Sequence, residues 1–147
     1  MSKYDHHFIK VAQLYSELSH ATRKKVGAVI VKNNSIISDG YNGTPVSSES
    51  NDCEDANGTT HWYVLHAEAN AITKIAKSTN SCDGASLYIT LSPCKECSKL
   101  ILQSGIKRVI YKDKYRDISG IDFLGKYNIE CIQIDEWYSY KFGNRGN

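Results

Sequence analysis

Apolar residues recur within residues 5–18 at the spacing of one helical face. The repeating positions are Phe8, Val11, Ala12, Tyr15 and Leu18. This period predicts an amphipathic helix that packs against a sheet. A polar connector, residues 21–25, follows the helix.

A β-hairpin is predicted directly after the connector. Residues 26–32 form a β-branched and apolar run, and residues 35–39 suit a second strand. The pair Asn33 and Asn34 between them suits a tight turn. The Gly-Tyr-Asn-Gly-Thr-Pro segment at residues 40–45 then redirects the chain.

The rest of the chain alternates between helical and strand patterns. The predicted helices are residues 66–77, 94–104 and 118–127, and the predicted strands are residues 86–91, 108–111 and 131–134. Because a helix joins the first two of these strands, a right-handed crossover makes them parallel. We therefore predict one domain over residues 1–147, an α/β fold built as a three-layer α/β/α sandwich with a mixed five-stranded sheet.

Residues 46–60 are rich in Ser, Asn, Asp and Gly and have no apolar periodicity, which predicts a long surface loop or lid. Cys53 lies within this loop and His61 follows it. A second metal site is one interpretation of this pair, and two unrelated side chains are the simpler one.

The C-terminal tail is unusually aromatic for a chain terminus. The residues concerned are Trp137, Tyr138, Tyr140 and Phe142. They predict either packing on the domain or part of a contact between subunits.

Composition narrows the range of partners. A net charge of +2 over 147 residues is too small for a nucleic-acid-binding surface, so a small-molecule substrate is expected. No apolar run is long enough to cross a membrane, and the first ten residues carry charges and histidines where a signal peptide is apolar. We expect a cytoplasmic protein whose five cysteines are ligands or free thiols.

Two short motifs carry the candidate chemistry, His-Ala-Glu at residues 66–68 and Pro-Cys-Lys-Glu-Cys at residues 93–97. One His and two Cys ligands leave the fourth corner of a zinc tetrahedron open for water, as in a catalytic site. Cys94 and Cys97 are three residues apart, which places both sulfurs on one face of a helical turn. Pro93 suits the start of that helix, whose exposed N–H groups favour thiolates.

Glu68 is two residues from His66 and need not be a ligand. Its carboxylate can take a proton from a zinc-bound water and return it to a ring nitrogen and a leaving amine, which is hydrolytic deamination. The alternatives for the Cys-x-x-Cys pair are a redox pair and half of a structural zinc site. His-x-Glu upstream and the lack of a second Cys-x-x-Cys favour the deaminase interpretation.

Basic residues supply candidate phosphate contacts. Arg23, Lys24 and Lys25 in the connector are either a solvated loop or such a contact. A second basic and aromatic stretch, with Lys114, Tyr115 and Arg116, follows a predicted strand, where α/β proteins place their ligand-binding loops.

These segments resemble a known family. The motifs around residues 66–72, 90–97 and 105–109 look like those of the cytidine deaminase superfamily, and residues 26–31 with 40–45 resemble its deoxycytidylate (dCMP) deaminase branch. The resemblance covers residues 5–134 and implies that water converts dCMP to dUMP and ammonia, for thymidylate synthesis. It implies His66, Cys94 and Cys97 as zinc ligands and Glu68 as the proton shuttle.

The resemblance also implies substrate and effector contacts. The Asn42 side chain is expected to bind the sugar, the Ala67 backbone N–H the pyrimidine O2, and the Ser92 carbonyl the exocyclic amine. From spacing alone, Asn42 could equally be a turn residue. Family members are often hexamers activated by dCTP with Mg²⁺ and inhibited by dTTP, which places an effector near Gly43 and Thr44.

One departure from the family pattern bears on these expectations. Residues 45–48 read Pro-Val-Ser-Ser, where relatives commonly have a glycine soon after the proline, which argues against effector binding and a second zinc site but not against the catalytic zinc. The alternative functions are deamination of cytidine, guanine or a tRNA adenosine, and a non-catalytic zinc-containing nucleotide sensor.

Overall fold

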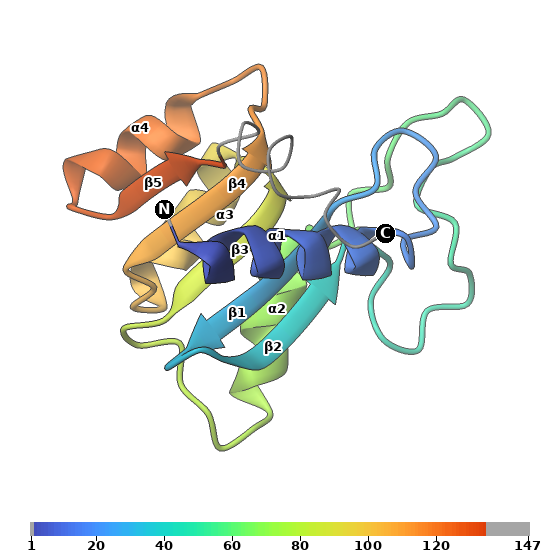
Figure 1. The fold of residues 1–147 in the computed structure, drawn as a ribbon. Helices are drawn as coiled ribbons and strands as arrows, with labels where there is room; N and C mark the ends of the chain where they lie inside the picture. Colours follow the sequence, from blue (N-terminus) through green and yellow to red (C-terminus); the bar gives the residue numbers. More distant parts are fainter. Residues whose placement is uncertain (1, 135–147) are drawn as a thin grey trace, which may run out of the picture.

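The computed structural model describes residues 2–134, and these form four helices and five strands (Figure 1). In chain order they are α1 (Lys3–Ser16), β1 (Gly27–Lys32), β2 (Ser35–Tyr41), α2 (Ala67–Ala76), β3 (Ser86–Leu91), α3 (Lys95–Gln103), β4 (Arg108–Asp113), α4 (Ser119–Lys126) and β5 (Glu130–Gln133). Every predicted helix and strand is confirmed, with ends that shift by one or two residues.

The strands form one sheet in the order β2-β1-β3-β4-β5. β1 is antiparallel to both β2 and β3, whereas β3, β4 and β5 are mutually parallel. The predicted mixed sheet and parallel β3–β4 pair are therefore confirmed. Asn33 and Asn34 make the β1–β2 turn, both with positive φ, which suits their short polar side chains.

Successive side chains along each strand point to opposite faces of the sheet, so the core has one part on each face. On one face Val29, Tyr88 and Ile110 pack against Phe8 and Ala12 of α1. The opposite face packs against α2, α3 and α4; its buried residues include Ala28, Ile30, Leu87, Ile89, Val109, Ala71, Ile101 and Leu124. Figure 1 shows α1 in front of the sheet with α2 and α3 behind it. The predicted three-layer sandwich is confirmed.

Helix α2 lies close against β2 because Gly40 has no side chain. A Cβ atom at this position would lie 2.4 Å from the Ala67 carbonyl oxygen and 2.7 Å from the Ala71 nitrogen. Two side chains complete the contact, with Asn70 Nδ2 donating to the Tyr41 carbonyl at 2.7 Å and Ser38 Oγ donating to that of Ala71 at 2.7 Å. The start of α2 is thereby fixed relative to the sheet.

A buried ionic contact joins α1 to the sheet. Asp5 is only 2% exposed and accepts from Arg108 through both carboxylate oxygens, at 2.8 and 2.9 Å, and from the Tyr88 hydroxyl at 2.6 Å. Burial by itself raises the pKa of Asp5, but the hydrogen bonds from Arg108, Tyr88 and the Ser2 N–H outweigh it and hold the pKa well below its usual value. Asp5 is thus ionised in the fold.

The C-terminal tail and possible membrane-spanning segments are the subject of two further expectations. The aromatic tail residues Trp137, Tyr138, Tyr140 and Phe142 lie outside the described residues. Among residues 2–134, no helix combines the length and the apolar character that crossing a membrane requires.

We predict that Asp5→Asn lowers the free energy of unfolding by ~3 kcal/mol, because it leaves the Arg108 guanidinium without its buried partner. Glu130→Gln is the matched control, since Glu130 contacts the same guanidinium at 3.4 Å but its side chain is 62% exposed. We expect less than about 0.5 kcal/mol there. Urea unfolding measures both, and equal losses in the two variants would contradict the assigned role of burial.

Candidate active site

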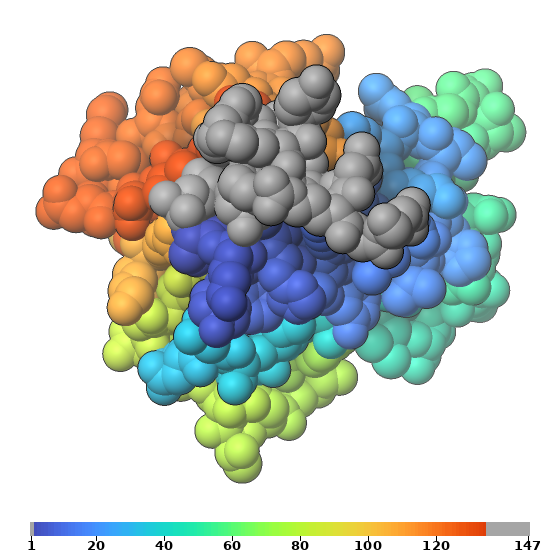
Figure 2. All heavy atoms as spheres, viewed as in Figure 1, coloured from blue at the N-terminus to red at the C-terminus, as the bar shows by residue number. Residues whose placement is uncertain are grey.

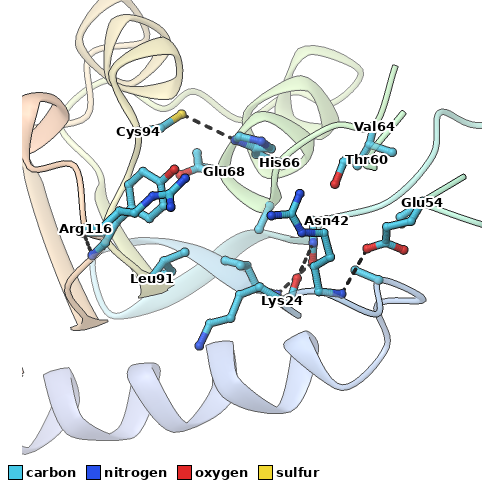
Figure 3. A pocket seen from close by; sticks show the side chains of 17 residues that line it. Lys24, Asn42, Glu54, Thr60, Val64, His66, Glu68, Leu91, Cys94 and Arg116 are labelled. Atoms are coloured by element: carbon cyan, nitrogen blue, oxygen red, sulfur yellow. Dashed lines mark hydrogen bonds between the residues drawn. The ribbon is translucent and has the colours of Figure 1, made fainter. Parts of the chain in front are cut away.

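A cavity of about 390 Å³ opens at one end of the sheet (Figure 3). Its lining comes from the chain just before β1, at Val26, and just after β2, at Asn42. The ends of β3 and β4 add Ser92 and Tyr115, and His66 comes from the start of α2. Because β1 runs antiparallel to β3, its first residue lies beside the last residues of β3, and all these segments meet at one edge.

Three potential metal ligands meet at the edge of this cavity, and two of them, His66 and Cys94, line it. His66 Nδ1 lies 3.6 Å from the Cys94 sulfur and 3.4 Å from the Cys97 sulfur, and the three atoms lie within 4.8 Å of one another. His66 is the N-cap of α2 and Cys94 the N-cap of α3, both with extended backbone. Pro93 therefore lies directly before the N-cap of α3, at the start of the helix.

The spacing of these atoms fits a zinc ion. Zinc bound at usual Zn–N and Zn–S lengths with tetrahedral angles separates a nitrogen from a sulfur ligand by about 3.6 Å. The observed separations of 3.4 and 3.6 Å match this value. Within residues 2–134, this is the one cluster of three His, Cys, Asp or Glu side chains with metal-binding spacing. Three protein ligands leave the fourth corner of a zinc tetrahedron for water.

The ligand set is prepared for metal binding by its own charges. Hydrogen bonds from Cys97 and from His66 lower the pKa of the Cys94 thiol to about 4. The same contact and burial raise the pKa of Cys97, while the Cys94 thiolate raises that of His66. Cys94 therefore loses its proton readily, whereas the pair of thiols keeps the second proton. Binding of a metal ion displaces that second proton.

Helix α4 supports the turn that carries Cys94. A Cβ atom at Gly120 would lie 2.3 Å from the Pro93 carbonyl oxygen and 2.7 Å from Ser98 Oγ. Ser98 is fully buried and its hydroxyl donates to the Cys94 carbonyl at 2.9 Å. The backbone of α4 thus packs directly against the ligand turn and limits its movement.

Glu68 lies beside the ligands in the first turn of α2. It lines the cavity and is only 3% exposed. Burial raises its pKa, which makes the carboxyl a better proton acceptor than an exposed glutamate. Figure 3 shows Glu68 between His66 and Arg116, facing the cavity.

Ala67 and Ser92, two residues with expected backbone contacts, also line the cavity. Ala67 is the first residue of α2, where the backbone N–H has no partner within the helix. Ser92 holds the segment after β4, because its hydroxyl accepts from the Tyr115 N–H at 2.7 Å. Its own N–H donates to the Asp113 carbonyl at 2.9 Å.

Asn42 ties the connector before β1 to the end of β2. Its side-chain oxygen accepts from the Val26 N–H at 2.9 Å, and its Nδ2 donates to the Lys24 carbonyl at 2.8 Å. It also lines the cavity. Asn42 is therefore more than a turn residue, and one lone pair and one N–H of its amide remain for a ligand.

Four of the predicted phosphate or effector residues line the cavity, namely Arg23, Lys24, Tyr115 and Arg116. Lys24 is paired with Asp113 at 3.8 Å, whereas the Arg116 guanidinium lies over the Tyr115 ring at 6.0 Å from its centroid. Among the described residues, no carboxylate forms an ion pair with Arg23 or Arg116.

Lys25, Gly43 and Thr44 are not part of the lining. Gly43 instead pairs with Leu65 through two backbone hydrogen bonds, and the Thr44 hydroxyl donates to the Ser50 carbonyl at 3.0 Å. These contacts order the two ends of the long loop.

Cys53 and His61 lie together without forming a metal cluster within residues 2–134. The His61 N–H donates to the Cys53 carbonyl at 2.8 Å, and the His61 ring stacks on Tyr63 at 4.9 Å. Cys53 is 1% exposed, and burial is the largest of the effects that raise its thiol pKa.

Sequence reasoning missed several lining residues. Leu91 and Val64 give the cavity apolar wall, and Glu54 contributes a carboxylate from the long loop. Leu91 ends a predicted strand at the expected edge, so its position could have been found. Glu54 gave no signal, because a single acidic residue in a polar loop has no periodic or motif context.

Comparison with known proteins agrees with this geometry. The family model described as "Cytidine and deoxycytidylate deaminase zinc-binding region" matches residues 2–113. The deoxycytidylate deaminase of Enterobacteria phage T4 is 36% identical, in a match that covers 73% of this chain and 76% of the phage protein. The human deoxycytidylate deaminase is 41% identical, covering 76% of this chain and 66% of the human protein.

A solved structure extends the similarity to three dimensions. The dCMP deaminase of the cyanophage S-TIM5, determined in complex with dCMP and dUMP, has a TM-score of 0.88 and 45% sequence identity. The match covers 91% of this chain and 99% of the cyanophage chain. The chain described here therefore belongs to the cytidine and deoxycytidylate deaminase family.

Proposed function

We propose that this protein is a zinc-dependent deaminase that hydrolyses dCMP to dUMP and ammonia and so supplies dUMP for thymidylate synthesis. The observation that carries the proposal is the cluster of His66, Cys94 and Cys97 at a cavity that Glu68 and two arginines, Arg23 and Arg116, also line. The similar S-TIM5 protein, whose structure was determined with dCMP and dUMP, supports the choice of substrate.

His66, Cys94 and Cys97 would hold the zinc ion. When bound there, zinc supplies a water molecule acidified towards neutral pH. Glu68 accepts the proton that the attacking water loses. It delivers this proton to the ring nitrogen. It then takes the second proton of the former water from the hydroxyl now on the ring carbon and delivers that proton to the leaving amine, so that water and dCMP give dUMP and ammonia in balance.

The backbone near the metal orients the base. The N–H of Ala67 donates to the pyrimidine O2, and the carbonyl of Ser92 accepts from the exocyclic amine. This pairing recognises cytosine, because a keto group at that position leaves the carbonyl of Ser92 without a donor. The Asn42 side chain contacts the sugar with the donor and acceptor that its backbone contacts leave.

Arg23 and Arg116 bind the 5′-phosphate. Both line the cavity and neither forms an ion pair with a described carboxylate, whereas Lys24 is paired with Asp113. Guanidinium groups suit a phosphate because they offer parallel N–H donors. Tyr115 places Arg116 by stacking under its guanidinium.

We also propose finer properties on the basis of the family resemblance. The chain acts as one domain in the cytoplasm and assembles as a homo-oligomer, most simply a hexamer, activated by dCTP with Mg²⁺ and inhibited by dTTP. Large apolar side chains at the surface support assembly, since Trp62 is 92% and Val46 84% exposed.

The first prediction concerns substrate choice. With dCMP, deoxycytidine, CMP and cytidine in parallel, we expect ammonia release to favour dCMP over deoxycytidine by about 10²-fold in kcat/KM. Two charge-assisted contacts to the phosphate account for a factor of this size. Parallel assays with dCTP test activation. If the zinc-loaded protein turned over no cytosine compound, guanine and tRNA adenosine would be the substrates to test next.

The second prediction concerns Glu68. The variant Glu68→Gln keeps the size of the side chain but cannot accept a proton, so we expect kcat to fall by about 10³-fold. Zinc content and melting temperature should match those of the unaltered protein. Turnover near the unaltered rate would rule out the shuttle role of Glu68, whereas the non-catalytic sensor predicts no turnover by the unaltered protein.

The third prediction concerns the metal ligands. Cys94→Ser replaces a thiolate ligand with a hydroxyl, and we expect zinc content after dialysis against a mild chelator to fall together with activity. Cys131→Ser is the control, because Cys131 is a half-buried thiol of β5 outside the cavity. Full zinc content in Cys94→Ser would contradict the ligand assignment.

A further inference from the structure

The long loop after β2 contains a small, ordered hairpin. Glu54 and Thr60 form an isolated antiparallel bridge, and the Asp55 side chain closes the turn by accepting from the N–H groups of Asn57 and Thr59 at 2.9 and 3.0 Å. The His61 N–H bonds the Cys53 carbonyl at its base. Side-chain turns of this kind fix a loop in the absence of an apolar core.

This hairpin grips the connector through one carboxylate. The Thr22 N–H donates to both oxygens of Glu54, at 3.0 and 3.2 Å, and the Arg23 N–H donates to one of them at 3.2 Å. The connector (blue) and the long loop (teal to green) lie against each other in Figures 1 and 2. A dashed line in Figure 3 marks the contact of Glu54 with the connector.

The connector is therefore held on both sides of Arg23. Glu54 binds the backbone at Thr22 and Arg23, and Asn42 binds it at Lys24 and Val26. Arg23 itself is exposed and lines the cavity. A long, flexible side chain benefits from a fixed backbone, because less conformational freedom is lost when its guanidinium binds a ligand.

We propose that Glu54 is a positioning residue for nucleotide recognition: it fixes the backbone at Arg23 so that this guanidinium meets the 5′-phosphate of the substrate. The inference rests on the proposed function and adds a residue that does not itself touch the phosphate. It assigns the hairpin a role in selecting nucleotides over nucleosides.

The direction in which phosphate binding changes when Glu54 is removed distinguishes this positioning role from a simple effect of its charge. Glu54 is an anion at the cavity that would receive a phosphate, so loss of its charge alone would strengthen phosphate binding. Loss of its backbone contacts would instead release Arg23 and weaken phosphate binding. A variant without the carboxylate therefore distinguishes the two by the direction in which KM changes.

The experiment compares KM and kcat for dCMP and deoxycytidine in zinc-loaded protein. For Glu54→Ala we expect KM for dCMP to rise about tenfold, with little change in kcat and in the deoxycytidine parameters. Glu54→Gln keeps one acceptor oxygen and should fall between Glu54→Ala and the unaltered protein. A melting curve and zinc assay accompany each variant.

Two further variants make the test specific. Asp52→Ala removes the same charge two residues away, at an exposed side chain, and we expect less than about a twofold change in KM. In an Arg23→Ala background, Glu54→Ala should add less than about a twofold effect, because its influence passes through Arg23. This cycle needs only dCMP as substrate.

Three results would overturn the inference: an unchanged or lower KM for dCMP in Glu54→Ala, equal losses for dCMP and deoxycytidine, or full additivity with Arg23→Ala. Failure of the proposed function shows itself separately, because the unaltered protein would then not deaminate dCMP at all. In that case the binding of dUMP to the same variants is measured by calorimetry. We expect weaker binding for Glu54→Ala, and unchanged binding would overturn the positioning role of Glu54.

Discussion

The cavity depends on one geometric constraint, that a histidine nitrogen and two cysteine sulfurs lie within bonding distance of a common point. His66 and Cys94 are 28 residues apart in the chain, and they meet because each caps a helix at the same end of the sheet. Two close backbone contacts hold those helix starts. Gly40 brings β2 against α2, and Gly120 brings α4 against the turn at Cys94.

The two sides of the cavity are stabilised in different ways. The metal side rests on helices and a buried apolar core, in which packing leaves little freedom. The other side, where we propose that the 5′-phosphate binds, consists of irregular segments joined by hydrogen bonds from side chains to backbone, chiefly those of Asn42 and Glu54. Reaction geometry and substrate recognition can therefore be altered separately.

Sequence patterns predicted the metal side better than the recognition side. Period and alternation revealed all the helices and strands of residues 2–134, and the His-x-Glu and Cys-x-x-Cys motifs marked the ligands. The contacts of Glu54 could not be predicted, because they join a loop to a connector 32 residues away without any periodic signal. For the same reason Lys25 could not be distinguished from Arg23, because only the folded structure shows that Arg23 lines the cavity and Lys25 does not.

The ion pair between Asp5 and Arg108 has a consequence for how the chain folds during synthesis. Its partners are 103 residues apart, so helix α1 emerges from the ribosome long before its buried cation exists. Until β4 has been made, the Asp5 carboxylate has only the Ser2 N–H and the Tyr88 hydroxyl as donors, and full docking of the first helix on the sheet would bury its charge without the cation. Docking of the first helix is therefore a late event, delayed by the closure of a long loop.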